Sequence, residues 1–231
     1  MALRNNSKKR TAIAACLLAA VGLLADDVHA LSVSGDILEL PEPPISSAHE
    51  QLESSSHMFF WTEQLALSVG SSTNVNVIPF VNNPSRLYAS GVASIEATWA
   101  GILLPAVYNS YFLHGDKQGP NQEFSGSIDF DAEIVAIIYK QSALFDTDSV
   151  FGAPATTYGG GGSSRIFELD GPRNWFEISE DKLTLTFNTV VAHNMDDMRI
   201  ITAVPEPGTS MLVAIGLGAL ALRRRFVRLE D

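Results

Sequence analysis

Short segments rich in β-branched and aromatic residues recur along the middle of the chain, and several alternate apolar with polar side chains. In residues 182–191, Leu183, Leu185 and Phe187 alternate with polar neighbours, and residues 179–181 before them have the composition of a tight turn. A period of two indicates a strand with one buried face. Further strands are predicted at residues 58–69, 74–81, 91–103, 107–115, 123–130, 133–139, 165–169, 175–179 and 198–204. The Ala content of residues 91–103 would also suit a helix.

This spacing predicts an all-β fold, an antiparallel β-sandwich with jelly-roll-like strand order. The same pattern offers no convincing amphipathic helix of three turns within the module. We therefore expect helices only at the two ends of the chain, as an N-terminal signal helix and a short C-terminal apolar helix.

The first 30 residues have the three parts of a secretory signal peptide. A basic start is followed by an apolar run at residues 11–25 and by small or modest side chains before Ala30, the predicted cleavage site. The run is shorter than a bilayer span requires. Cys16, the only cysteine, lies inside it, and too little of the run precedes it for a lipoprotein signal. The mature chain would therefore contain no disulfide and no cysteine-based site.

The charge of the chain is strongly divided between its ends and its middle. The net charge is −11, but residues 31–204 alone carry 21 acidic and 7 basic side chains. Such a surface repels nucleic acid, because nucleic-acid affinity depends on Lys and Arg at phosphates. We expect no nucleic-acid partner, and we attribute the acidic balance mainly to solubility.

Residues 204–231 combine an extended tripeptide, an apolar run and a basic cluster, in that order. Pro205, Glu206 and Pro207 cannot join a helix or a central strand, because proline fixes φ and lacks an N–H. Residues 211–222 would form an apolar helix of about 18 Å, at 1.5 Å per residue. This is a short, strained or transient transmembrane helix, and the arginines behind it favour the cytoplasmic side. Those arginines are Arg223, Arg224 and Arg225.

This tail resembles the PEP-CTERM sorting signal of bacterial exported proteins. The resemblance rests on four ordered features: the tripeptide, the apolar run, the arginine cluster and their place near the end. The same tripeptide at residues 41–43 has neither of the other elements behind it. The resemblance implies export by the secretion machinery and transient membrane anchoring. It also implies cleavage near the tripeptide by an exosortase-type membrane protease, and delivery to the cell surface or an extracellular polysaccharide matrix.

Between the two signals, we expect an extended polar leader at residues 31–57 and a β-sandwich module at residues 58–203. Residues 52–64, 108–116, 124–139, 176–188 and 196–202 resemble, in order, a module of uncharacterised PEP-CTERM exoproteins. That resemblance supports the sandwich and the sorting signal. It implies no activity and no catalytic residues.

The module offers few candidates for chemistry. Asp146 and Asp148, two apart in a segment predicted as a loop, are a speculative calcium site, since calcium takes several carboxylate oxygens. We expect no other cofactor. His114 and Asp116 are the most suggestive imidazole–carboxylate pair, although a catalytic role would need a third partner. Residues 156–162 are predicted as a flexible loop beside a binding face.

Exposed aromatic side chains could stack on sugars, although such residues in strands more often pack in a core. The candidates are Trp99, Tyr108, Tyr111 and Trp175. Two functions therefore stay open. The first is a non-catalytic surface or matrix protein that associates with polysaccharide. The alternative is a secreted glycan-active hydrolase, which would need two carboxylates across a cleft.

Overall fold

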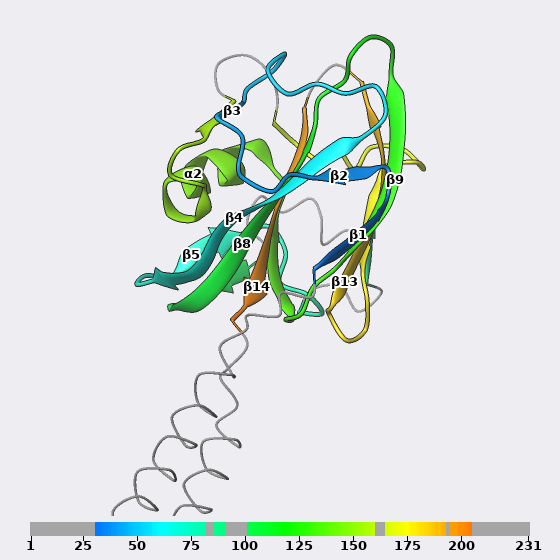
Figure 1. Cartoon of the computed structure of the whole chain (residues 1–231). Coiled ribbons are helices and arrows are strands. Elements are labelled where there is room, and N and C mark those ends of the chain that lie inside the picture. The colour runs from blue at the N-terminus through cyan, green and yellow to red at the C-terminus, as the bar shows by residue number, and fades with distance from the viewer. Residues whose placement is uncertain (1–30, 82–85, 91–100, 160–164, 193–194, 205–231) are drawn as a thin grey trace, which may run out of the picture. The chain divides into compact units, whose positions relative to one another are not determined.

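The computed structural model describes residues 31–81, 86–90, 101–159, 165–192 and 195–204 (Figure 1). The predicted signal peptide with Ala30 lies outside these residues, and so does the sorting signal from Pro205 onward, including Glu206, Pro207 and the arginine cluster 223–225. Within the part of the chain that is described, no helix has both the length and the apolarity that a bilayer crossing demands.

The described chain is mostly β, with one helix. The strands are β1 (Ser32–Gly35), β2 (Ile37–Glu39), β3 (Ser46–Ser47), β4 (Met58–Val69), β5 (Thr73–Val75), β6 (Leu87–Ala89), β7 (Gly101–Leu103), β8 (Ala106–Gly115), β9 (Gln122–Asp129), β10 (Ile134–Ile138), β11 (Thr157–Tyr158), β12 (Trp175–Ile178), β13 (Thr184–Val191) and β14 (Asp196–Ala203). The helix is α2 (Gln141–Phe151), between β10 and β11.

Two five-stranded sheets make up the body of the fold. Their strand orders are β1-β9-β13-β12-β6 and β10-β14-β8-β4-β2, and most neighbours are antiparallel. Two small two-stranded sheets, β11-β3 and β5-β7, flank them. The pairs β2–β4 and β3–β11 are parallel. The sheets are therefore not purely antiparallel, whereas the prediction was a purely antiparallel sandwich. The jelly-roll strand order stays a prediction.

Both large sheets contribute side chains to one apolar core. Phe60 on β4 stacks with Tyr111 on β8, and both rings contact Phe130, which follows β9 in the other sheet. On β13, Leu185 and Phe187 are buried while their neighbours Thr184 and Thr186 are half-buried, as the alternation predicted. A shared core between two sheets is what the predicted sandwich requires.

Residues 31–57 differ from the predicted extended leader. They supply three strands: β1 pairs with β9, β2 pairs with β4, and β3 pairs with β11. Gly126 on β9 shows how closely this segment packs, because a Cβ there would lie 2.6 Å from Ile37 and 2.7 Å from the carbonyl oxygen of Ser34. The segment is therefore an integral edge of both sheets.

Helix α2 is the second departure from prediction, because residues 141–151 were expected to contain a loop. Ala143, Leu144, Thr147 and Phe151 are buried, and their spacing places them on one helical stripe. Thr147 is the polar member of that stripe, and its buried hydroxyl donates a hydrogen bond to the carbonyl of Ala143 at 2.6 Å. Packing of this stripe, rather than intrinsic helix propensity, holds the helix.

Candidate functional site

Six ionisable side chains from five separate segments meet beneath helix α2. We call them the ion-pair network. They are Glu63 (β4), His114 (β8), Asp148 (α2), Arg165 (between β11 and β12), and Asp197 and Arg199 (β14). Five of the six are buried, and the side chain of Asp148 is 22 % exposed. Charged groups are rarely buried unless they are paired, so this network is the most unusual polar feature of the described residues.

Arg199 is the centre of one half of the network. Its Nε and Nη2 donate to the two carboxylate oxygens of Glu63 at 2.7 and 2.9 Å. Nη2 also donates to Asp148 at 2.9 Å, and Nη1 donates to the hydroxyl of Thr147 at 2.8 Å. A forked pair of this kind is the strongest ion-pair geometry available to proteins. Although burial opposes it, the charge of Glu63 raises the pKa of Arg199 above its usual value.

Arg165 is the centre of the other half. Its Nε donates to Asp197 at 2.8 Å, and its Nη1 donates to Asp148 at 2.7 Å. Asp148 therefore joins both halves, because its carboxylate accepts from both guanidinium groups. Burial alone would raise the pKa of Asp197, but His114 and Arg165 outweigh that effect and hold it below its usual value.

His114 is the remaining member of the network. Its Nδ1 lies 2.7 Å from a carboxylate oxygen of Asp197, and its Nε2 lies 3.2 Å from the carbonyl oxygen of Leu52. Each ring nitrogen therefore faces an oxygen acceptor. Asp197 lies between this imidazole and the guanidinium group of Arg165.

Two aromatic rings enclose the guanidinium groups. The Cζ of Arg165 lies 5.7 Å from the ring centre of Phe112 and 5.2 Å from that of Tyr158. The corresponding distances for Arg199 are 5.2 and 5.4 Å. Tyr158 also donates its hydroxyl proton to Glu63. Burial, followed by the charge of Glu63, raises the pKa of this phenol. The rings exclude water and so strengthen the ion pairs between them.

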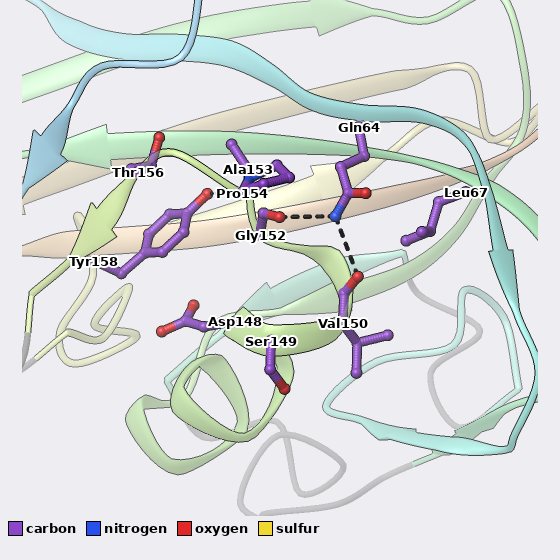
Figure 2. A pocket seen from close by; sticks show the side chains of 10 residues that line it. All are labelled: Gln64, Leu67, Asp148, Ser149, Val150, Gly152, Ala153, Pro154, Thr156 and Tyr158. Carbon is purple, nitrogen blue, oxygen red and sulfur yellow. Dashed lines mark hydrogen bonds between the residues drawn. The ribbon is translucent and has the colours of Figure 1, made fainter.

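A pocket of about 610 Å³ opens on the outer side of the network (Figure 2). Asp148 and Tyr158 line it, so its wall includes members or neighbours of the network. Gln64 closes one side by donating from its amide to the carbonyls of Val150 and Gly152, at 3.2 and 2.7 Å. The remaining lining residues are Leu67, Ser149, Ala153, Pro154 and Thr156. The lining mixes polar and apolar side chains, and it is open to a small polar ligand.

The start of the segment predicted as a loop, residues 156–162, includes strand β11, and its place beside a binding face stays a prediction. Thr156 and Tyr158, at the start of residues 156–162, line this pocket, and residues 160–162 lie outside the described residues. The strand β11 anchors this start by pairing with β3, and the Thr156 hydroxyl donates to the carbonyl of Pro44 at 2.6 Å.

A second, smaller hollow of about 350 Å³ lies near the far end of β8. It is lined by His49, Glu50, Glu53, Asp116, Lys117, Gly119 and Ala192. Asp116 is buried, accepts from the backbone N–H of Glu50 at 2.7 Å and lies 3.9 Å from Nε2 of His49. The predicted pairing of His114 with Asp116 is therefore wrong. Asp116 lies beyond the end of β8, so the strand period of two does not hold it beside His114. His114 contacts Asp197 instead, and Asp116 contacts Glu50 and His49.

The predicted calcium residues occupy a different setting from the one expected. Asp146 and Asp148 lie on α2, not in a loop, and two residues apart on a helix do not face the same direction. Asp148 is held by two arginines, while Asp146 is exposed. Across the described ranges, no group of three His, Cys, Asp or Glu side chains is placed to hold a metal ion. Calcium binding itself stays a prediction, without the loop geometry that motivated it.

The aromatic candidates are mostly part of the core. Tyr108 and Tyr111 are buried, as their strand positions favoured, and Trp175 is half-buried. Trp99 lies outside the described residues. The sequence analysis missed Arg165 and Arg199, which hold the network together. The available signal was their position, because each is a lone cation beside an apolar run in a chain poor in basic residues.

Comparison with known proteins adds one finding about residues 203–225. They match the PEP-CTERM protein-sorting motif. The chain carries a PEP-CTERM sorting signal. The motif supports export, transient membrane anchoring and processing by an exosortase, which is a membrane protein. No curated protein and no solved structure matches the chain.

Two adjacent aspartates are expected to respond in opposite ways to the same substitution. Asp197→Asn should lower the free energy of unfolding by about 3–5 kcal/mol, because it removes the counter-charge of buried Arg165 and the carboxylate that contacts His114. Asp196→Asn should change it little or raise it. Asp196 is also buried, but within the described ranges no Lys or Arg side chain pairs with it. Burial first, then nearby Glu168 and Asp197, raises its pKa well above the usual value, and Thr189 donates to it.

Urea denaturation of the two variants against the natural chain measures this difference. Because its folded-state pKa is lowered, Asp197 contributes stability above about pH 4, the unfolded value, and loses it as the pH falls through the lowered pKa. The deficit of Asp197→Asn should therefore shrink in acid. Equal losses for both variants at neutral pH would contradict this description of the network.

Proposed function

We propose that the chain is a non-catalytic cell-surface or extracellular-matrix protein, sorted through residues 203–225, whose module associates with polysaccharide. The observation that carries the sorting part is the PEP-CTERM motif. Export to a surface or matrix, away from nucleic acid, also suits a module with 21 acidic and 7 basic side chains in residues 31–204.

The non-catalytic assignment is supported by the state of the carboxylates at the larger pocket. Acid hydrolysis of a glycosidic bond needs one carboxyl group that gives up a proton and a second that is free to act as base or nucleophile. Among the described residues, Asp148 is the only carboxylate that lines this pocket, and both of its oxygens accept from guanidinium groups. Glu63 behind it is clamped by Arg199 and Tyr158. Neither is free for proton transfer.

The smaller hollow is where the hydrolase alternative has its best support. Asp116 is buried there beside His49, and Glu50 and Glu53 line the same hollow. If this alternative held, the protein would release reducing sugars from a glycan, and Glu53→Gln would abolish the release. We favour the binding function, because the carboxylates at the larger pocket are held in ion pairs with arginine.

A binding experiment tests the polysaccharide association. Exopolysaccharide extracted from the native host is the probe, and retardation of the protein in a gel containing it is the measurement. Ser149→Trp places an indole in the pocket and should remove the retardation. Ser142→Trp is the matched control, because Ser142 is also exposed on α2 but does not line the pocket.

The outcomes separate two claims. If the natural chain is retarded and both variants behave like it, the pocket is not the binding site. If the natural chain is not retarded, polysaccharide association is wrong, while sorting through residues 203–225 is unaffected.

A further inference from the structure

One end of the module exposes large apolar side chains on neighbouring segments. We call it the apolar end, and it consists of Leu65, Ile102, Leu104 and Val107, which are 46, 59, 66 and 45 % exposed. Leu65 lies in the bulged part of β4, and Ile102 lies on β7. Leu104 lies in the connection between β7 and β8, and Val107 lies on β8. Single exposed apolar residues are common, but a group at one end of a fold indicates a contact surface.

The two segments that form the apolar end carry no charge. Residues 64–81 and residues 101–113 contain no Asp, Glu, Lys, Arg or His. This is unusual in a chain with 26 acidic residues. A charged side chain resists transfer out of water, so these two segments can approach an apolar medium at little cost. The charged pair beside the end of β14 is Glu133 with Lys182, whose solvent-accessible side chains would stay in the polar headgroup layer.

The apolar end is also connected to the core by a short loop, a hydrogen bond and packing. Leu104 and Pro105 alone connect β7 to β8, and the hydroxyl of Tyr108 donates to the carbonyl of Leu104 at 2.7 Å. Below the exposed side chains, Val69, Val75 and Leu103 are buried in the core that also contains Tyr108. The side chains of Leu104 and Val107 are therefore exposed above a packed layer of buried residues.

The chain leaves the module at this same end. In the β8–β14 ladder, Ala203 pairs with Tyr108, the neighbour of Val107. Figure 1 shows β14 ending beside the start of β8, at the lower edge of the module. The PEP-CTERM motif begins at residue 203, so the sorting signal starts within one strand spacing of the apolar end.

The length of chain between the module and the apolar run is short. Residues 204–210 separate the end of β14 from the run that begins at Met211. At no more than about 3.6 Å per residue, they span roughly 25 Å when fully extended. A bilayer that holds the apolar run therefore lies within reach of the apolar end.

We propose that the apolar end rests in the interfacial layer of the lipid bilayer while the PEP-CTERM signal anchors the chain. This inference depends on the membrane anchoring that the motif implies. The contact orients the module with the end of β14 toward the membrane, and keeps residues 205–207 at the bilayer surface, where a membrane protease acts. It is an apolar contact of the kind that amphipathic surface segments make, without charge attraction.

An environment-sensitive fluorophore tests the contact. The full chain with Cys16→Ser is given a single new thiol by Leu104→Cys and labelled with nitrobenzoxadiazole. It is reconstituted into vesicles of phosphatidylethanolamine and phosphatidylglycerol. Gln118→Cys is the matched control, because Gln118 is exposed beyond the opposite end of β8. We expect a blue shift and quenching by headgroup-proximal spin-labelled lipid at position 104, and neither at position 118.

Flotation of the vesicles keeps the two ideas separate. If the labelled chain does not float with lipid, the anchoring itself fails. If it floats but the fluorophore at position 104 shows neither a blue shift nor quenching, as expected at position 118, the proposed contact is wrong. Protection of position 104 only when the processing protease shares the vesicle would replace the lipid contact by a protein interface. Val107→Glu, at a second exposed position, should weaken the signal at 104, and no such loss would also count against the proposal.

Discussion

Replacing Arg199 by methionine is expected to lower the free energy of unfolding by about 3–5 kcal/mol, the usual cost of removing one partner from a buried ion pair. Methionine fills most of the volume but leaves Glu63 without its forked partner and Asp148 with one guanidinium instead of two. The hydroxyl oxygen of Thr147 also loses the hydrogen bond that it accepts from Arg199. These groups lie at the meeting point of β4, β14 and α2, so the loss should destabilise the fold as a whole.

A surface arginine provides the control for this substitution. Arg173 pairs with Glu123 at 3.1 Å, and its side chain is 63 % exposed. Arg173→Met should cost no more than about 1 kcal/mol, because exposed pairs contribute little. In the double variant Arg199→Met with Glu63→Gln, part of the loss should return, since no uncompensated charge remains at Glu63. A loss below 1 kcal/mol for Arg199→Met in urea denaturation would show that the network does not hold the fold together.

Replacing Pro205, Glu206 and Pro207 together by alanine is expected to abolish processing of the exported chain. The two prolines keep the tripeptide extended and outside any helix, and alanine removes that restriction next to an apolar run. The tripeptide also lies inside the matched motif. The uncleaved precursor should accumulate in the membrane fraction, which immunoblotting of cell fractions measures.

The chain contains its own control for this experiment. Pro41, Glu42 and Pro43 repeat the same tripeptide, and all three are exposed between β2 and β3. Their replacement by alanine should leave processing unchanged, because no apolar run follows them. Loss of processing in this second variant would mean that the tripeptide alone is recognised. Normal processing in the first would mean that it is not recognised at all.

Local patterns in the sequence predicted those parts of the fold that depend on neighbouring residues. The β4 segment 58–69 was located with the bounds that the structure gives, since its aromatic and β-branched run is continuous. The turn at residues 179–181 was also correct: the N–H of Ser179 donates to the carbonyl of Thr184 at 2.9 Å. Residues 165–169 were predicted as a strand, but they form only a single bridge, from Arg165 to Met195.

The candidate site depended on contacts between distant residues and could not be predicted in this way. Arg199 and Glu63 are 136 positions apart, and no periodicity relates them. The helix was missed for a related reason. Thr147 and Asp148 are poor helix formers, and their place in α2 is set by packing and ion pairs that involve other strands. The sorting signal, by contrast, was predictable because all its features are consecutive.

The most direct test of the central claim is the intact mass of the protein recovered from the medium and surface fractions of its native host. We expect a chain that begins near Leu31 and ends near residues 205–207, since both signals would have been removed. A chain that retains residues 211–226 and is found only in membranes would contradict sorting by cleavage, and would make this an anchored surface protein instead.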